Sequence, residues 1–244
     1  LRWRLGSAYA AAWRRVSSLV ERAAPRSARA ERAIPRLPPE PVHRRYGIAR
    51  GRPVDRVYIE GFLERHAADI RGRVLEILDD TYTRRFGGAN VDRGDVLDNS
   101  ERPGGVTIRG DLVTGEGIPR AAFDCFICTQ TLSLIYELHR AVANAHDLLA
   151  PGGVLLLTVP GISQQADPDH EEFPDYWRFT KRSVQRLLTE AFGAGNVAVE
   201  AHGTVQAAGA FLYGLPAEHV DPATLAPHDP DYEMVVCARA VRVT

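Results

Sequence analysis

The most constraining feature of this sequence is an alternation of short apolar runs with segments of helical periodicity, repeated from residue 54 to the end of the chain. An apolar run of about four to eight residues is typical of a strand that is buried on both faces. Strands that alternate with helices favour a mostly parallel sheet with helices on both faces. We therefore predict an α/β fold with seven strands, in which the last two strands and a turn-rich insert between them close one edge. The expected strands are 73–78, 90–96, 106–109, 123–129, 154–159, 196–201 and 233–240, and the expected helices begin near 54 and span 137–149 and 181–192.

Residues 1–45 differ in composition from the rest of the chain. Positions 1–32 are rich in arginine and alanine with apolar residues near helical spacing, and 34–41 form a proline-rich connector that cannot be helix or central strand. We expect a basic helical extension over 1–45, followed by one domain over 46–244. The extension could dock on that domain or on a second copy of the chain, giving a homodimer. It could also contact a membrane surface or an anionic partner, because Trp3 and Trp13 suit an interface.

Charge and cysteine content exclude several classes of function. The 244 residues carry a formal net charge of −1, and the region after residue 46 has no basic stripe, so nucleic acid is not an expected partner. No apolar run approaches the roughly 20 residues that a membrane-spanning helix needs, so no integral membrane segment is expected. Three sparse cysteines suit a cytoplasmic location. We expect Cys125 and Cys128 to be buried thiols, because no second pair of ligands with zinc spacing follows them.

Acidic residues and turns follow the first three expected strands. The first strand runs through Glu76 into a turn at 78–82. Asp95 falls 19 residues after Glu76, near the end of the second expected strand. Asp111 and Leu112 come directly after the third strand, behind a glycine. Carboxylates at the carboxyl ends of parallel strands lie where α/β proteins bind their ligands.

The second half of the domain continues this pattern. The fourth expected strand ends in Thr129 and Gln130, residues 148–155 read LLAPGGVL, and residues 176–180 read YWRFT before a helix. Together and in this order, these segments resemble the motifs of class I S-adenosylmethionine (SAM)-dependent methyltransferases over roughly 54–244. The resemblance implies a Rossmann-like sheet and SAM as cofactor. It also implies transfer of a methyl group to an O or N atom of a small polar metabolite, such as a sugar, an amino sugar or a natural-product intermediate.

The same resemblance assigns residues to the cofactor. Asp95 would accept hydrogen bonds from both ribose hydroxyls, and Asp111 would meet the adenine amino group. Family members normally have glycine where this chain has Leu78, because glycine lets the backbone approach the cofactor without a Cβ. Leu78 could therefore narrow the space beside the methionine moiety. The expected cofactor-binding residues are Arg56, Tyr58, Glu76, Leu78, Thr81, Asp95, Asp111, Leu112, Thr129 and Gln130.

Arg56 is the candidate for the methionine end of the cofactor. SAM carries a carboxylate there, and a planar guanidinium binds carboxylates in a two-point fork. Tyr58 would pack nearby. The alternative is a surface pair of Asp55 and Arg56 with Tyr58 in the core.

The methyl acceptor is expected beyond the carboxyl ends of the strands, where the loop 161–177 is rich in acids. An O or N nucleophile loses a proton, which a histidine or carboxylate within reach can take. His170 is the candidate base, with Asp167 and Asp169 as orienting or alternative bases. A solvated acidic loop is the alternative interpretation. Consecutive acids in one loop rarely converge on one ion, so no metal is expected.

Two hypotheses from other classes stay open. A non-catalytic methyltransferase-like partner protein would account for Leu78 in the turn, with the extension as its docking element. An NAD-type oxidoreductase shares this architecture, but the turn after the first strand lacks the G-x-G-x-x-G pattern of dinucleotide sites.

Overall fold

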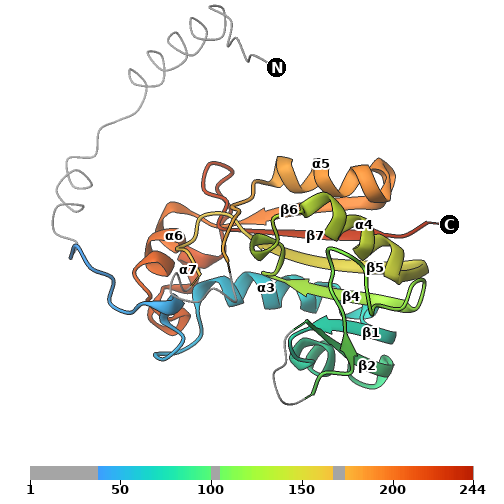
Figure 1. The fold of residues 1–244 in the computed structure, drawn as a ribbon. Coiled ribbons are helices and arrows are strands. Elements are labelled where there is room, and N and C mark those ends of the chain that lie inside the picture. The colour runs from blue at the N-terminus through green and yellow to red at the C-terminus, as the bar shows by residue number, and fades with distance from the viewer. Residues whose placement is uncertain (1–37, 100–104, 167–173, 244) are drawn as a thin grey trace, which may run out of the picture. The chain divides into compact units, whose positions relative to one another are not determined.

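The computed structural model describes residues 38–99, 105–166 and 174–243 (Figure 1). Contacts divide the chain into two units, 1–40 and 41–244, and the fold described below is that of the second unit. The predicted helical extension lies, up to residue 37, outside the described residues.

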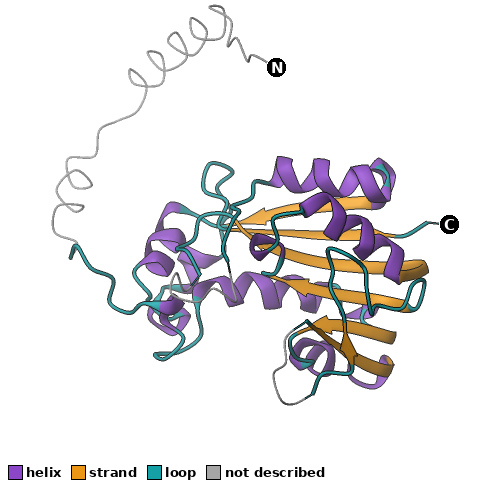
Figure 2. Cartoon of the chain, viewed as in Figure 1, coloured by secondary structure: helices purple, strands orange, loops and turns teal. Residues whose placement is uncertain are grey.

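The described residues form one seven-stranded sheet with helices on both faces (Figure 2). The strand order is β3-β2-β1-β4-β5-β7-β6. β7 runs antiparallel to both of its neighbours, and the other pairs are parallel. The prediction of a mostly parallel sheet, closed at one edge by the last two strands, is therefore confirmed. The strands are β1 (Gly72–Ile77), β2 (Val91–Asp98), β3 (Ile108–Arg109), β4 (Phe123–Thr129), β5 (Leu149–Pro160), β6 (Val197–His202) and β7 (Val235–Val241).

Two hydrophobic cores, one on each face of the sheet, hold the helices in place. One core contains the apolar faces of α4 and α5, and the other contains those of α3 and α6 (Figure 1). Central strands are apolar on both faces because each face packs against a core, as the buried run Cys125–Cys128 of β4 shows. The helices are α3 (Val54–Arg65), α4 (Leu138–Leu148), α5 (Lys181–Phe192), α6 (Val205–Leu212) and α7 (Pro222–Leu225). Short 3-10 turns lie at Arg45–Gly47, Ala67–Asp69, Gly88–Asn90, Leu132–Leu134, Ala194–Asn196 and Ala217–His219, and a π turn spans Thr83–Gly87.

Cysteine chemistry agrees with the sequence interpretation. Cys125, Cys128 and Cys237 are free and buried. Cys125 and Cys237 belong to the core under α3, whereas Cys128 belongs to the core under α4 and α5. In the described part of the chain, no helix has the length and apolar character that crossing a membrane requires.

Most strand boundaries differ from the expected ones by one or two residues, and β5 begins five residues earlier than expected. β2 continues to Asp98, two residues beyond the predicted end at 96, because Leu97 and Asp98 pair with β3. β5 begins at Leu149 rather than at 154, because Leu149 pairs with Phe123 before the chain turns through Gly152.

The strand order reverses between β1 and β4, which are direct neighbours in the sheet. In open α/β sheets, ligands bind outside the carboxyl ends of the strands at such a reversal. The fold therefore directs attention to the segments that follow β1, β2, β4 and β5.

Candidate functional site

Two cavities meet at this edge of the sheet. The larger cavity, about 510 Å³, extends over the ends of β1 and β2 and is lined by Asp98 and Asp111 among others. The smaller cavity, about 330 Å³, lies against the first turn of α3 and the start of β7. Leu78 and Leu134 line both cavities. The two spaces therefore form adjoining halves of one candidate site.

The turn after β1 places Leu78 at the junction of the two cavities. Leu78 has φ +71°, in the left-handed region that favours glycine. Its side chain is 45% exposed although it is large and apolar. The turn thus has a left-handed backbone that suits glycine, but it carries a large side chain that lines both cavities.

Glu76 shapes this turn from below. Its carboxylate accepts hydrogen bonds from the Tyr82 backbone N–H at 3.1 Å and from the Thr83 N–H and hydroxyl at 2.7 and 2.8 Å. Burial raises the pKa of Glu76 to about 7. Thr81 is exposed, and its N–H donates to the Asp79 carboxylate at 2.8 Å. Neither Glu76 nor Thr81 is among the described residues that line the cavities.

The carboxylate at the end of β2 is Asp98, not Asp95. Asp95 lies opposite Leu75 in the middle of the strand pair and is 1% exposed. Its oxygens take ion pairs from Arg73 at 2.8 Å and Arg93 at 3.0 Å. Asp98 is the last residue of β2 and lines the larger cavity. The expectation for Asp95 placed the strand end too early, and the carboxylate that ends β2 and lines the larger cavity is Asp98.

Asp111 and Leu112, which the sequence analysis assigns to the cofactor, line the larger cavity. Asp111 Oδ1 accepts the backbone N–H groups of Val113 at 2.6 Å and Thr114 at 3.2 Å. These bonds hold the carboxylate in place, and Oδ2 can accept a further donor.

The end of β4 contributes one of its two predicted residues. Gln130 has φ +54° and lines the smaller cavity, and its N–H donates to the Thr158 carbonyl at 2.7 Å. Thr129 is the last residue of β4, and its carbonyl accepts the Thr131 hydroxyl at 3.0 Å. Thr129 is not one of the described lining residues.

The first turn of α3 brings two charged side chains to the smaller cavity. Arg56 donates from Nη1 to the Tyr82 hydroxyl at 2.8 Å. Asp55 Oδ1 is sealed from solvent and has no hydrogen-bond partner among the described residues. Burial raises the pKa of Asp55 above its usual value, and the neighbouring Arg56 offsets only part of this increase. Tyr58 is buried elsewhere, stacked on His202 with ring centroids 5.5 Å apart, so it packs in the core rather than against the cavity.

An ion pair between Asp175 and Arg178 also lines the smaller cavity. Arg178 donates to both Asp175 oxygens, at 2.5 and 2.8 Å, and Asp175 also accepts the Ala166 N–H at 2.6 Å. Both residues line the smaller cavity. Sequence reasoning missed the pair, although the D-x-x-R spacing was its available signal. The predicted base His170 and its partners Asp167 and Asp169 lie outside the described residues.

Two tyrosines, also missed, line the larger cavity. Tyr136 and Tyr176 are 61% and 49% exposed and meet edge to face with ring centroids 5.4 Å apart. Exposed aromatic rings beside a cavity are suited to packing against a flat ligand.

Solved structures show what this fold is similar to. A SAM-dependent methyltransferase from Mesorhizobium loti is 16% identical with a TM-score of 0.50, over 78% of this chain and 98% of that chain. One from Archaeoglobus fulgidus is 10% identical with a TM-score of 0.50, over 77% and 94%. Phosphoethanolamine N-methyltransferase 2 of Haemonchus contortus, in complex with S-adenosyl-L-methionine, is 15% identical with a TM-score of 0.50, over 77% of this chain and 53% of that one. No protein-family model and no curated protein sequence matches the chain. The described part of this chain has the fold of class I SAM-dependent methyltransferases.

Proposed function

We propose that this chain binds SAM across the two cavities and transfers its methyl group to an O or N atom of a small polar metabolite. The observation that carries the proposal is the junction of the cavities beside the β1–β4 reversal, with carboxylates from β2 and from the segment after β3 on one side. A sugar, an amino sugar or a natural-product intermediate is the proposed class of acceptor.

The larger cavity suits the adenosine half of the cofactor. Asp98 can accept hydrogen bonds from the two ribose hydroxyls, the same role that a carboxylate at the end of the second strand has in dinucleotide sites. Asp111 Oδ2 can accept the adenine amino group, because Oδ1 already holds the turn. Leu112 and Tyr136 offer apolar surface to the adenine ring.

The smaller cavity suits the methionine end and the acceptor. Arg56 lies there with a guanidinium that can bind the cofactor carboxylate. The volume of about 330 Å³ is at the lower end of the range for small-molecule sites, which favours a compact acceptor. Leu78 stands between the halves, so the ribose–sulfur link of a bound cofactor has to pass it.

Transfer requires alignment of nucleophile, methyl carbon and sulfur, and removal of one proton. A lone pair of the acceptor O or N forms the new bond to the methyl carbon as the C–S bond breaks, and the bonding pair stays on sulfur. The acceptor proton passes to a base. His170, oriented by Asp167 or Asp169, is our sequence-based candidate, and the described geometry adds Asp55, which lines the smaller cavity and has one buried, unpartnered carboxylate oxygen.

The second candidate is a non-catalytic partner protein. Leu78 favours it, because a large side chain at the cavity junction obstructs a cofactor that spans both halves. The three free thiols support a reducing compartment such as the cytoplasm for either function.

Calorimetric titration with SAM and with its demethylated product separates the two functions. The proposal predicts saturable binding of both ligands by the full chain, and methylated product from labelled SAM with small hydroxylated or amino metabolites. Absence of binding of either ligand at millimolar concentration would refute the enzyme and favour the partner protein.

A further inference from the structure

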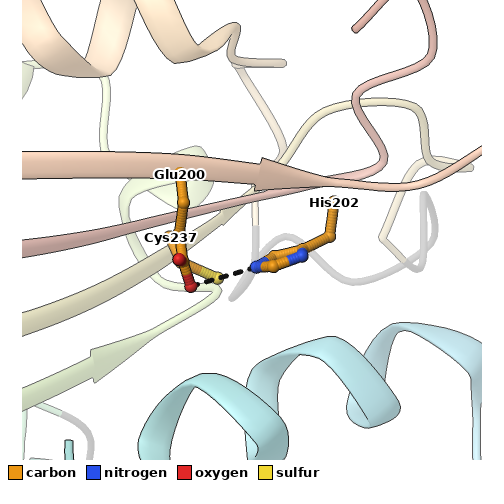
Figure 3. Close-up of side chains that lie close together, drawn as sticks. All are labelled: Glu200, His202 and Cys237. Atoms are coloured by element: carbon orange, nitrogen blue, oxygen red, sulfur yellow. Dashed lines mark hydrogen bonds and ion pairs between the residues drawn. The ribbon is translucent and has the colours of Figure 1, made fainter. Parts of the chain in front are cut away.

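Three side chains with different ligand atoms meet on one face of the β6–β7 pair, apart from the cavity linings (Figure 3). Glu200 on β6 is the cross-strand partner of Cys237 on β7. His202 follows Glu200 by two residues, so it points to the same face of the strand. One oxygen, one nitrogen and one sulfur atom lie within 4.8 Å of one another.

Helix α3 fixes two of these three side chains. Arg65 forms an ion pair with Glu200. Tyr58 stacks on the His202 ring with a centroid distance of 5.5 Å and an interplanar angle of 8°. His202 Nε2 in turn lies 3.1 Å from Glu200 Oε1. Arg65 and Tyr58 are thus outer partners of the kind that orient the ligands of protein metal sites.

We propose that Glu200, His202 and Cys237 form a site for a borderline-soft divalent cation of the zinc class. Zinc takes thiolate, imidazole and carboxylate ligands together, whereas magnesium and calcium require oxygen ligands. On binding, the Cys237 thiol loses its proton to solvent and bonds to the metal through sulfur. His202 binds as the neutral ring through Nε2. Thiolate and carboxylate then balance the two positive charges, and a water molecule fills the fourth position.

Such an ion would act on the wall of the smaller cavity. The chain between His202 and Val235 forms the insert that carries α6 and α7, and its Phe211 and Met234 line that cavity. A metal bound to both β6 and β7 ties the two ends of the insert together and restricts its freedom. The site consists of residues on β6 and β7 supported by α3, so it does not depend on methyl transfer by the chain.

Without a metal, the same geometry is an ion-pair network in which Arg65 and His202 satisfy Glu200 and Cys237 fills the core. Metal titration of the purified full chain decides between the two, with Zn²⁺ and Co²⁺ as probes and Mg²⁺ as the negative control. We expect one Zn²⁺ per chain, a rise in melting temperature with Zn²⁺, and a thiolate-to-cobalt charge-transfer band with Co²⁺.

Cys237→Ser is expected to abolish this band and to weaken Zn²⁺ binding by more than about 100-fold, because losing a ligand exceeds the 10–100-fold cost of losing an outer partner. His202→Gln, which keeps the volume near Tyr58, is expected to weaken Zn²⁺ binding to a similar extent. Cys128→Ser is the matched control, since Cys128 is an equally buried thiol in the opposite core and its loss leaves the band intact. A wild-type chain that binds no stoichiometric Zn²⁺, or a Cys237→Ser chain that keeps the band, overturns the proposal.

Discussion

Leu78 offers a way to separate backbone strain from obstruction of the site. Its φ of +71° costs an L-residue about 1–2 kcal/mol relative to glycine. A glycine at this position relieves that strain, but the greater entropy of its unfolded chain offsets about 0.4–1 kcal/mol of the gain in stability. Leu78→Ala and Leu78→Gly both remove the projecting side chain, but only glycine removes the strain. The glycine variant should therefore exceed the alanine variant in free energy of unfolding by about 0.5–1 kcal/mol.

Cofactor affinity responds to the side chain rather than to the strain. Moving Leu78 aside for a bound cofactor forces it off its preferred rotamer, at about 0.5–1.5 kcal/mol. Both variants should then bind the demethylated cofactor roughly 2- to 12-fold more tightly than wild type, and equally to within about threefold. Urea unfolding and calorimetric titration measure the two quantities. An alanine variant as stable as the glycine variant would refute the left-handed turn, and unchanged affinity in both would refute the placement of Leu78 in the cofactor path.

Three further predictions follow from the site. Asp98→Asn should weaken binding of the demethylated cofactor by about 1.5–3 kcal/mol, measured by calorimetry. Asp95→Asn should instead lower folding stability and leave cofactor affinity within about twofold. The reverse pattern would indicate that Asp95 binds the ribose. Asp55→Asn should lower turnover at least roughly tenfold with cofactor affinity within about twofold, and unchanged turnover would remove Asp55 as a base. The free energy of unfolding should fall as pH rises from 4.5 to about 7, by up to about 1.4 kcal/mol per pH unit, because native Glu76 keeps a proton that the unfolded chain releases. Urea unfolding across this pH range should show that slope in wild type and not in Glu76→Gln, and an identical slope in both would contradict the raised pKa.

The sheet could be predicted from sequence because its central strands are apolar on both faces. The short apolar run at β4 is typical of a strand buried on both faces, and the segments that form α4 and α5 have the apolar spacing of helices. The strand boundaries were harder to predict from sequence. The end of β2 depends on its pairing with β3, and β3 is only two residues long. Because of that two-residue difference at the end of β2, the sequence analysis chose Asp95 rather than Asp98, the carboxylate that lines the larger cavity.

The site was predicted best where a residue lies next to a strand end. Asp111, Leu112 and Gln130 line the cavities as expected. Glu76 does not, because its side chain folds under the turn, and no sequence pattern distinguishes a carboxylate that holds backbone N–H groups from one that holds a ligand. The Glu200–Cys237 contact depends on strand register, which is fixed by pairing across 37 residues of chain and not by local sequence.

A crystal structure of the chain soaked with the demethylated cofactor would show whether the cofactor spans the two cavities. We expect adenosine in the larger cavity, with both ribose hydroxyls on Asp98 and the adenine amino group on Asp111. We also expect the sulfur beside Leu78 and the carboxylate on Arg56. Empty cavities at saturating ligand, or adenosine bound elsewhere on the sheet, would contradict the proposed function.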